Sequence, residues 1–148
     1  MSKRTSLSWL VFALASIVLL TEEVVEYPRT SFAEPGYSIR YVSAIPKRGS
    51  HFAVGDHIVL SVTVAYKLAV TDKGRIVLVL QKDDNSQLTS GHKQVQTEVS
   101  RGSGETTLTD EFDVPAGTSL VRVFIPLIPA GYKRTSGEVV IEYPVKKR

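Results

Sequence analysis

His57-Ile-Val-Leu-Ser-Val-Thr-Val-Ala-Tyr-Lys67 is the stretch that decides the fold of this 148-residue chain. Its apolar residues recur at every second position. Ile58, Leu60, Val62, Val64 and Tyr66 share one face, and Ser61, Thr63, Ala65 and Lys67 share the other. This alternation is typical of a β-strand that buries one face. The stretch therefore predicts a strand packed on a core.

Six further segments show strand character and are separated by turn residues. With the first stretch, the predicted strands cover residues 37–44, 57–67, 75–82, 93–100, 106–114, 119–127 and 138–145. Asp72-Lys73-Gly74 predicts a turn between the second strand and the third. In the fifth strand Asp110 falls on the apolar face, where we expect a β-bulge. No helix is predicted after residue 36.

Short strands with one buried face each must pair as two packed sheets. We therefore predict an all-β fold: an immunoglobulin-like antiparallel β-sandwich of about seven strands. The chain has no cysteine, so stability must come from the hydrophobic core and not from disulfides. Residues 37–148 are enough for one such core.

Two segments resemble a known class of module. Val54-Gly-Asp-His-Ile-Val-Leu-Ser-Val-Thr-Val64 and Glu111-Phe-Asp-Val-Pro-Ala-Gly117 are similar to turn-and-strand patterns in fibronectin-III-like and CARDB-like modules of bacterial surface proteins. The resemblance covers residues 37–145 at the level of the fold. It implies a spacer or binding platform, although a fold does not fix a function.

The N-terminus carries a separate signal. Lys3 and Arg4 precede a nearly unbroken apolar run from Leu7 to Leu20, and a basic segment followed by a short apolar one is typical of a secretory leader. We predict a signal peptide or signal-anchor helix over residues 1–20, a linker over 21–36 and the β-domain over 37–148.

The length of the leader leaves two alternatives open. The apolar run makes about 21 Å of helix, whereas a bilayer core is ~30 Å thick. No small-x-small cleavage site follows Leu20 directly, so we favour an uncleaved membrane anchor over a cleaved peptide. Either alternative predicts an extracytoplasmic location: periplasmic, cell-surface or secreted.

Net charge argues against a nucleic-acid partner. The chain has 18 Lys and Arg against 15 Asp and Glu, a net charge of +3. Apart from the last three residues it has no long run of one sign, and nucleic-acid-binding domains usually show a strong basic patch.

Catalytic and metal-binding motifs are also missing from the sequence. There is no G-x-S-x-G or H-E-x-x-H pattern. His51, Asp56 and His57 could approach each other around a turn, but surface residues flanking a strand are the simpler interpretation. We predict no catalytic residue, no cofactor, no metal site and no enzymatic activity.

Two loops remain candidates for a ligand. Asp83-Asp84-Asn85 offers oxygens that Ca²⁺ prefers, although Asx residues also favour turns for local reasons, and we favour the turn. Tyr132, in the loop before the last strand, is the tyrosine we expect to be exposed. It keeps a carbohydrate-binding alternative open, without further support from the sequence and with the ligand-binding residues unassigned.

The sharpest functional signal is a set of apolar residues on the face that should meet water. Strands 75–82, 119–127 and 138–145 would be neighbours in an immunoglobulin-like order. Their outward residues would then form one patch of Val77, Val79, Phe124 and Val140, bordered by Arg75, Arg122 and Glu142. Such patches often mark contact sites, although the linker or a loop of the same chain could cover this one.

These observations favour an exported, non-enzymatic module that mediates protein–protein contact or assembly outside the cytoplasm. The predicted interface residues are Val77, Val79, Arg122, Phe124 and Val140. The partner would be a protein or a second copy, and the N-terminal segment would contact the membrane. The alternative is a module that binds carbohydrate or Ca²⁺ through its loops.

Overall fold

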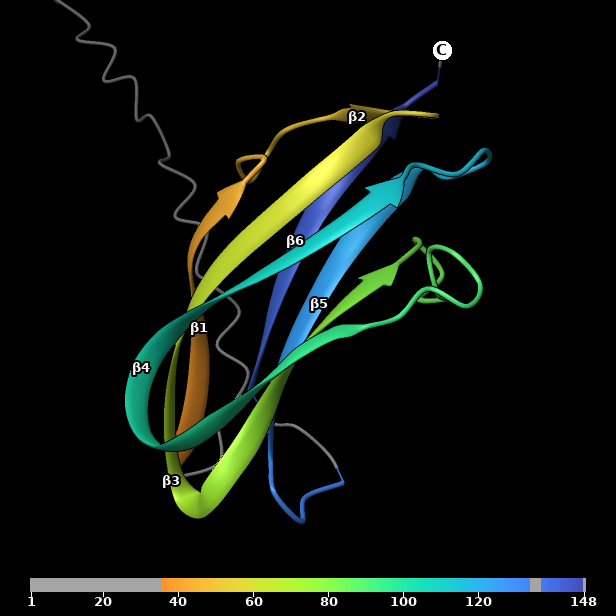
Figure 1. Ribbon diagram of the computed structural model, residues 1–148. Helices are drawn as coiled ribbons and strands as arrows, with labels where there is room; N and C mark the ends of the chain where they lie inside the picture. The colour runs from red at the N-terminus through yellow and green to blue at the C-terminus, as the bar shows by residue number, and fades with distance from the viewer. Residues whose placement is uncertain (1–35, 134–136, 148) are drawn as a thin grey trace, which may run out of the picture.

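The computed structural model describes residues 36–133 and 137–147. These residues form six strands: β1 (Tyr37–Ile45), β2 (Phe52–Ala53), β3 (His57–Gln81), β4 (Val95–Asp113), β5 (Leu120–Pro129) and β6 (Gly137–Lys146) (Figure 1). The described residues contain no helix, so the all-β prediction is confirmed and no helix here could span a membrane. The predicted leader and nearly all of the predicted linker lie outside the described residues.

The strands belong to one mixed sheet. β1, β3, β5, β6 and β2 are neighbours in that order, and β4 pairs with β3. All pairs are antiparallel except β2 with β6. The first half of β3 pairs with β1 and the second half with β5, so one long strand joins two groups of strands.

The predicted turn at Asp72-Lys73-Gly74 is wrong as a strand break, because β3 and β4 each run through two predicted strands. The two strands bend together instead: residues 69–72 of β3 lie opposite Arg101 alone. The Arg101 side chain donates to Asp72 Oδ1 at 3.0 Å and to the carbonyl of Ala69 at 2.9 Å. Arg101 therefore holds together a bulge, at a place where the sequence pattern predicted a turn.

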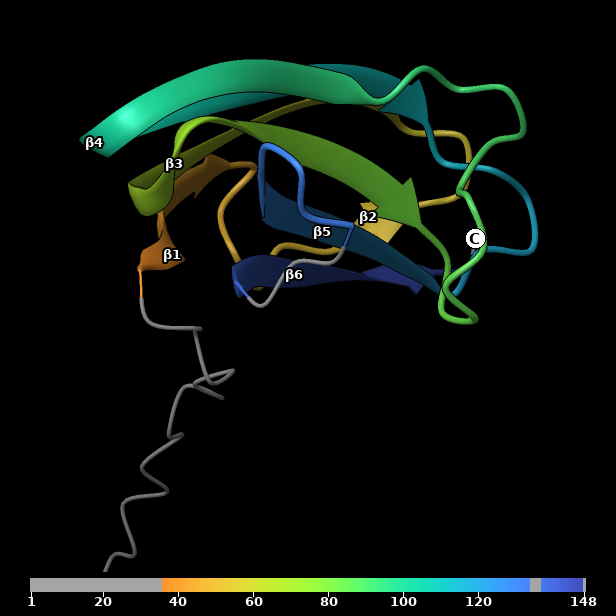
Figure 2. The same ribbon diagram turned by 90° about the horizontal axis from the view of Figure 1, so that it is seen from below.

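The bend brings the two halves of β3 over each other. In Figure 1 β3 runs down to its sharp turn and returns toward the same end of the molecule. Figure 2 shows β4 and much of β3 above β5, β6 and β2. The inward residues of both halves meet in one buried cluster.

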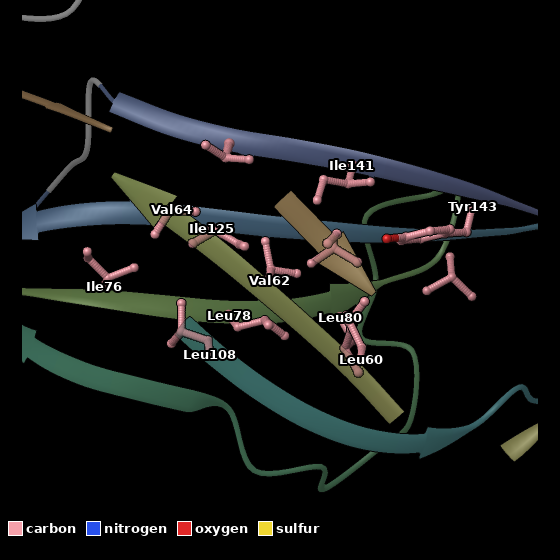
Figure 3. Packing of buried hydrophobic residues seen from close by; sticks show 14 of the residues in the cluster. Leu60, Val62, Val64, Ile76, Leu78, Leu80, Leu108, Ile125, Ile141 and Tyr143 are labelled. Atoms are coloured by element: carbon pink, nitrogen blue, oxygen red, sulfur yellow. The ribbon is translucent and has the colours of Figure 1, made fainter. Parts of the chain in front are cut away.

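The core confirms the period-two pattern. Leu60, Val62 and Val64 from the first half of β3 are fully buried, as are Ile76 and Leu78 from the second half. Figure 3 shows the strand carrying Leu60, Val62 and Val64 crossing the strands that carry Ile76, Leu78, Ile125 and Ile141. Full burial of a side chain of this size stabilises the fold by about 1.5–3 kcal/mol.

Tyr143 closes the core at one end. Its ring is fully buried and stacks on Phe52 of β2, with centroids 4.6 Å apart. Its hydroxyl donates to the carbonyl of Pro46 at 2.8 Å. The short strand β2, which the sequence pattern did not reveal, is thereby fixed against β6.

The expected bulge at Asp110 is also wrong. Asp110 pairs with Leu60 in an unbroken register, so its side chain points into the core and is only 8 % exposed. It is tolerated there because His92 Nε2 lies 2.8 and 3.0 Å from its two carboxylate oxygens. Oδ1 also accepts the backbone N–H of Glu111 at 2.9 Å. A buried charge needs such partners.

Candidate contact face

The second half of β3, β5 and β6 lie side by side, in the order that the sequence pattern predicted. The register places Val79 opposite Phe124, and Phe124 opposite Val140. Three of the four predicted apolar residues therefore form one row across three strands. We call the outward side of β3, β5 and β6 around this row the outer face.

Exposure along the row rises toward the edge of the outer face. Val79 and Phe124 are half-buried, and Val140 is 37 % exposed. Val77 differs from the expectation, because it is only 5 % exposed. It lies on a strand flanked by β4 and by β5, so neighbouring side chains cover it. Val77 therefore adds little accessible surface.

Arg122 borders the row on one side. Its Nε and Nη2 donate to Oε1 of Glu142 at 3.0 and 2.9 Å, and its Nη1 donates to Oδ1 of Asn85. The Arg122 side chain is 21 % exposed and that of Glu142 50 %. Arg122 thus joins the outer face to the loop after β3, and the rim carries both signs of charge.

The loop Asp83-Asp84-Asn85 has the geometry of a turn. Asn85 has a φ of 65°, and Asp84 Oδ1 accepts the backbone N–H of Ser86 at 2.9 Å. Hydrogen bonds from the Ser86 side chain and backbone lower the pKa of Asp84. Asp83 Oδ2 accepts the hydroxyl of Ser119 at 2.8 Å. Asp83, Asp84 and Asn85 therefore each already use a side-chain oxygen in a hydrogen bond within the protein.

The histidines do not converge on a metal site. His57 Nδ1 lies 2.8 Å from Asp113 Oδ1 on exposed surface, and Asp56 accepts the N–H of Ala53 at 2.7 Å. His51 is exposed in the short segment before β2. Within residues 36–133 and 137–147, no three His, Asp or Glu side chains lie close enough to hold a metal ion.

A groove lies beside the outer face, at the end where β5 finishes. It has a volume of about 480 Å³ and is open on one side. Its lining, which defines the Tyr132 groove, consists of Lys73, Gly74, Arg75, Gln96, Thr97, Glu98 and residues 128–132. Tyr132 is 41 % exposed, as the sequence predicted.

Sequence reasoning missed the rest of this groove. Glu98 and Ile128 reach the same place because both pair with Arg75, one from each side. That register depends on the bend in β3 and β4, which no local pattern revealed. A search for polar residues opposite Arg75 could have found Glu98 only after the pairing of the two strands was known.

Comparisons with known proteins add little to this geometry. No protein-family model matches the chain, and no curated protein matches it either. Among the solved structures that match, one described as "putative beta-galactosidase from bacteroides fragilis" has a TM-score of 0.43 and 14% identity. The match covers 74% of this chain and 16% of that one. The resemblance to fibronectin-III-like and CARDB-like modules therefore stays a prediction.

Proposed function

We propose that this chain is an exported, non-enzymatic module that makes protein–protein contacts through the outer face, in the first instance with a second copy of itself. The observation that carries the proposal is the row Val79–Phe124–Val140, apolar and partly accessible on the outward side of three strands. An apolar patch with a polar rim often marks a contact site.

The charges at the rim favour a second copy as the partner. Arg122 and Glu142 lie side by side next to the apolar row. In a two-fold dimer the same surface faces itself, so a rim with both signs can pair each charge with its opposite. A rim of one sign would repel its copy.

The finer fold assignment is part of the same proposal. We assign the chain to the immunoglobulin-like sandwiches, of the fibronectin-III-like or CARDB-like kind, because the neighbouring strands β3, β5 and β6 reproduce the order of three strands in that fold. The folded-over halves of β3 support two layers around one core.

Export is proposed from the N-terminus. Lys3 and Arg4 before Leu7–Leu20 support a signal anchor or a signal peptide, and therefore an extracytoplasmic domain. Fusion of alkaline phosphatase after Arg148 tests the location, since that enzyme is active only outside the cytoplasm. Export would be excluded if the fusion showed no phosphatase activity while the same fusion behind a known leader was active.

Self-association is tested with Phe124→Lys. We expect sedimentation of the full-length chain to show a concentration-dependent dimer that Phe124→Lys converts to monomer, with little change in melting temperature. Val59→Lys is the matched control, because Val59 is an exposed valine of β3 that pairs with Glu111, away from the outer face.

Two results would contradict the proposal. A wild-type chain that stays monomeric at every concentration would remove the contact with a second copy. A Phe124→Lys variant that melts far below wild type would show instead that Phe124 is needed for packing. Val59→Lys is expected to dimerise as wild type does.

A ligand-binding module is the second candidate function. The Tyr132 groove favours it, because its volume falls in the range of about 300–1,000 Å³ that is usual for small-molecule sites. The Asp83-Asp84-Asn85 loop gives it less support, since its oxygens are already engaged.

A further inference from the structure

The Tyr132 groove offers a fixed aromatic surface. The backbone N–H of Tyr132 donates to the carbonyl of Pro129 at 3.1 Å, which closes a tight turn. The Tyr132 ring also makes a T-shaped contact with the ring of Tyr37, a buried residue, with centroids 6.0 Å apart. The ring is therefore held in place while 41 % of the residue stays exposed.

The floor of the groove excludes one common mode of binding. Arg75 pairs with Glu98 of β4 on one side and with Ile128 of β5 on the other. The backbone of Arg75 is thus paired on both sides within the sheet, so an extended peptide cannot add to it as another strand. A ligand that lies over Arg75 must be recognised by side chains.

Those side chains supply both hydrogen-bond donors and acceptors. Arg75, Lys73 and Gln96 carry N–H donors. Glu98 carries a carboxylate that only accepts, and it lies 3.9 Å from Lys73 Nζ in an exposed, weak pair. Glu98 would repel a dianion such as phosphate more strongly than a ligand with a single negative charge. Sugar hydroxyls suit this mixture because each one both donates and accepts.

The net charge of the groove narrows the range of possible ligands further. Lys73 and Arg75 against Glu98 leave one positive charge in excess. Arg75 forms no ion pair with any residue in the described part of the chain. A guanidinium in this state matches a carboxylate in a bidentate fashion. The half-buried Ile128 and the ring of Tyr132 provide apolar surface for the C–H face of a pyranose.

We propose that the Tyr132 groove binds glycans that contain a uronic acid, with a pyranose ring on Tyr132, hydroxyls on Glu98 and Gln96, and the carboxylate on Arg75. This inference deepens the ligand-binding candidate and rests on it. It does not depend on dimerisation through Phe124, which belongs to another row of the sheet.

Matched disaccharides test the proposal. Cellobiouronic acid and cellobiose differ by one carboxylate, and digalacturonic acid and galactobiose differ by two; each sugar is titrated into the full-length chain by calorimetry or NMR. We expect at least one acidic member to bind with a Kd of ~1 mM or tighter. Its neutral partner should bind at least ~10-fold more weakly, since a hydrogen bond between charged groups is lost.

Three variants assign the contacts. Arg75→Gln is expected to weaken the acidic disaccharide ~10-fold and leave the neutral one unchanged. Tyr132→Ala should weaken both. Arg40→Gln is the matched control, because Arg40 is an exposed arginine on β1, outside the groove, and it should bind as wild type does.

Several outcomes would overturn the proposal. It fails if no disaccharide binds at millimolar concentration, if acidic and neutral members bind equally, or if Tyr132→Ala binds as well as wild type. Phe124→Lys separates the two proposals: glycan binding should survive in this monomer. Loss of glycan binding alone would leave the contact face intact, and loss of dimerisation alone would leave the groove intact.

Discussion

The pair formed by His92 and Asp110 allows us to predict which of its two partners costs more stability when it is removed. Asp110 is 8 % exposed, and its side chain pairs with His92, whose side chain is 27 % exposed. Truncating His92 leaves a carboxylate in the core with only the N–H of Glu111 as a partner. Truncating Asp110 leaves an imidazole that water can still reach. His92→Ala should therefore cost more stability than Asp110→Ala.

The expected losses in the free energy of unfolding follow from how deeply each side chain is buried. Leaving a buried carboxylate without its partner costs about 3–5 kcal/mol, and partial access to water places His92→Ala near the lower end, at about 3 kcal/mol. Losing hydrogen bonds to a charged group costs about 1.5–3 kcal/mol, so Asp110→Ala should cost about 2 kcal/mol. In a domain of this size each kcal/mol lowers the melting temperature by about 4 °C.

Urea unfolding of both single variants and the double variant measures the pair directly. We expect a coupling energy of about 1.5 kcal/mol, because the double variant loses both partners of the contact together. A larger loss in Asp110→Ala than in His92→Ala would refute the reasoning from burial. A coupling energy under about 0.5 kcal/mol would show that the contact contributes nothing beyond its separate parts.

Three further predictions concern the core and the bend. Leu60 is fully buried, so Leu60→Ala should cost about 3–4 kcal/mol in urea unfolding, and a loss below about 1 kcal/mol would contradict its place in the core. Gly102 has a φ of +123° at the bend; Gly102→Ala should cost more than about 1 kcal/mol, whereas Ser103→Ala, exposed next to it, should melt like wild type. Burial, with a smaller effect of Tyr41, raises the pKa of Tyr143 to about 12 from 10.0. The folded state therefore holds this proton more tightly, and stability should be constant below pH 10 and fall by on the order of 2 kcal/mol as the pH rises to about 12. Tyr143→Phe should show a smaller fall over the same range, and an equal fall would assign the effect to other groups.

Local patterns in the sequence were enough for the strands and for the inward residues. Period-two alternation identified Leu60, Val62 and Val64 as residues of the buried face, and all three are buried. The order of β3, β5 and β6 followed from one fold assumption and was confirmed. These features depend on spacing within a single strand or on one known arrangement, so the sequence carries them directly.

Long-range contacts were beyond such patterns. The continuity of β3 depends on Arg101 reaching Asp72 and Ala69, 29 and 32 residues away. The burial of Asp110 depends on His92, and the Tyr132 groove depends on Glu98 meeting Arg75. In each case the local sequence predicts a turn or an exposed position for a polar side chain, and only its distant partner explains where it lies.

The apolar row on the outer face has two physical explanations that differ in one measurable respect. Cross-strand pairs such as Val79 with Phe124 stabilise a sheet by about 0.2–1 kcal/mol even without a partner protein. Sheet packing alone would therefore make Phe124→Lys cost about that much stability and leave the assembly state unchanged. A contact surface would show a similarly small loss of stability together with complete loss of the dimer. Because the core beneath the row is already closed by Val123 and Ile125, both fully buried, folding does not require an apolar residue at position 124. The assembly state of Phe124→Lys therefore decides between packing and contact.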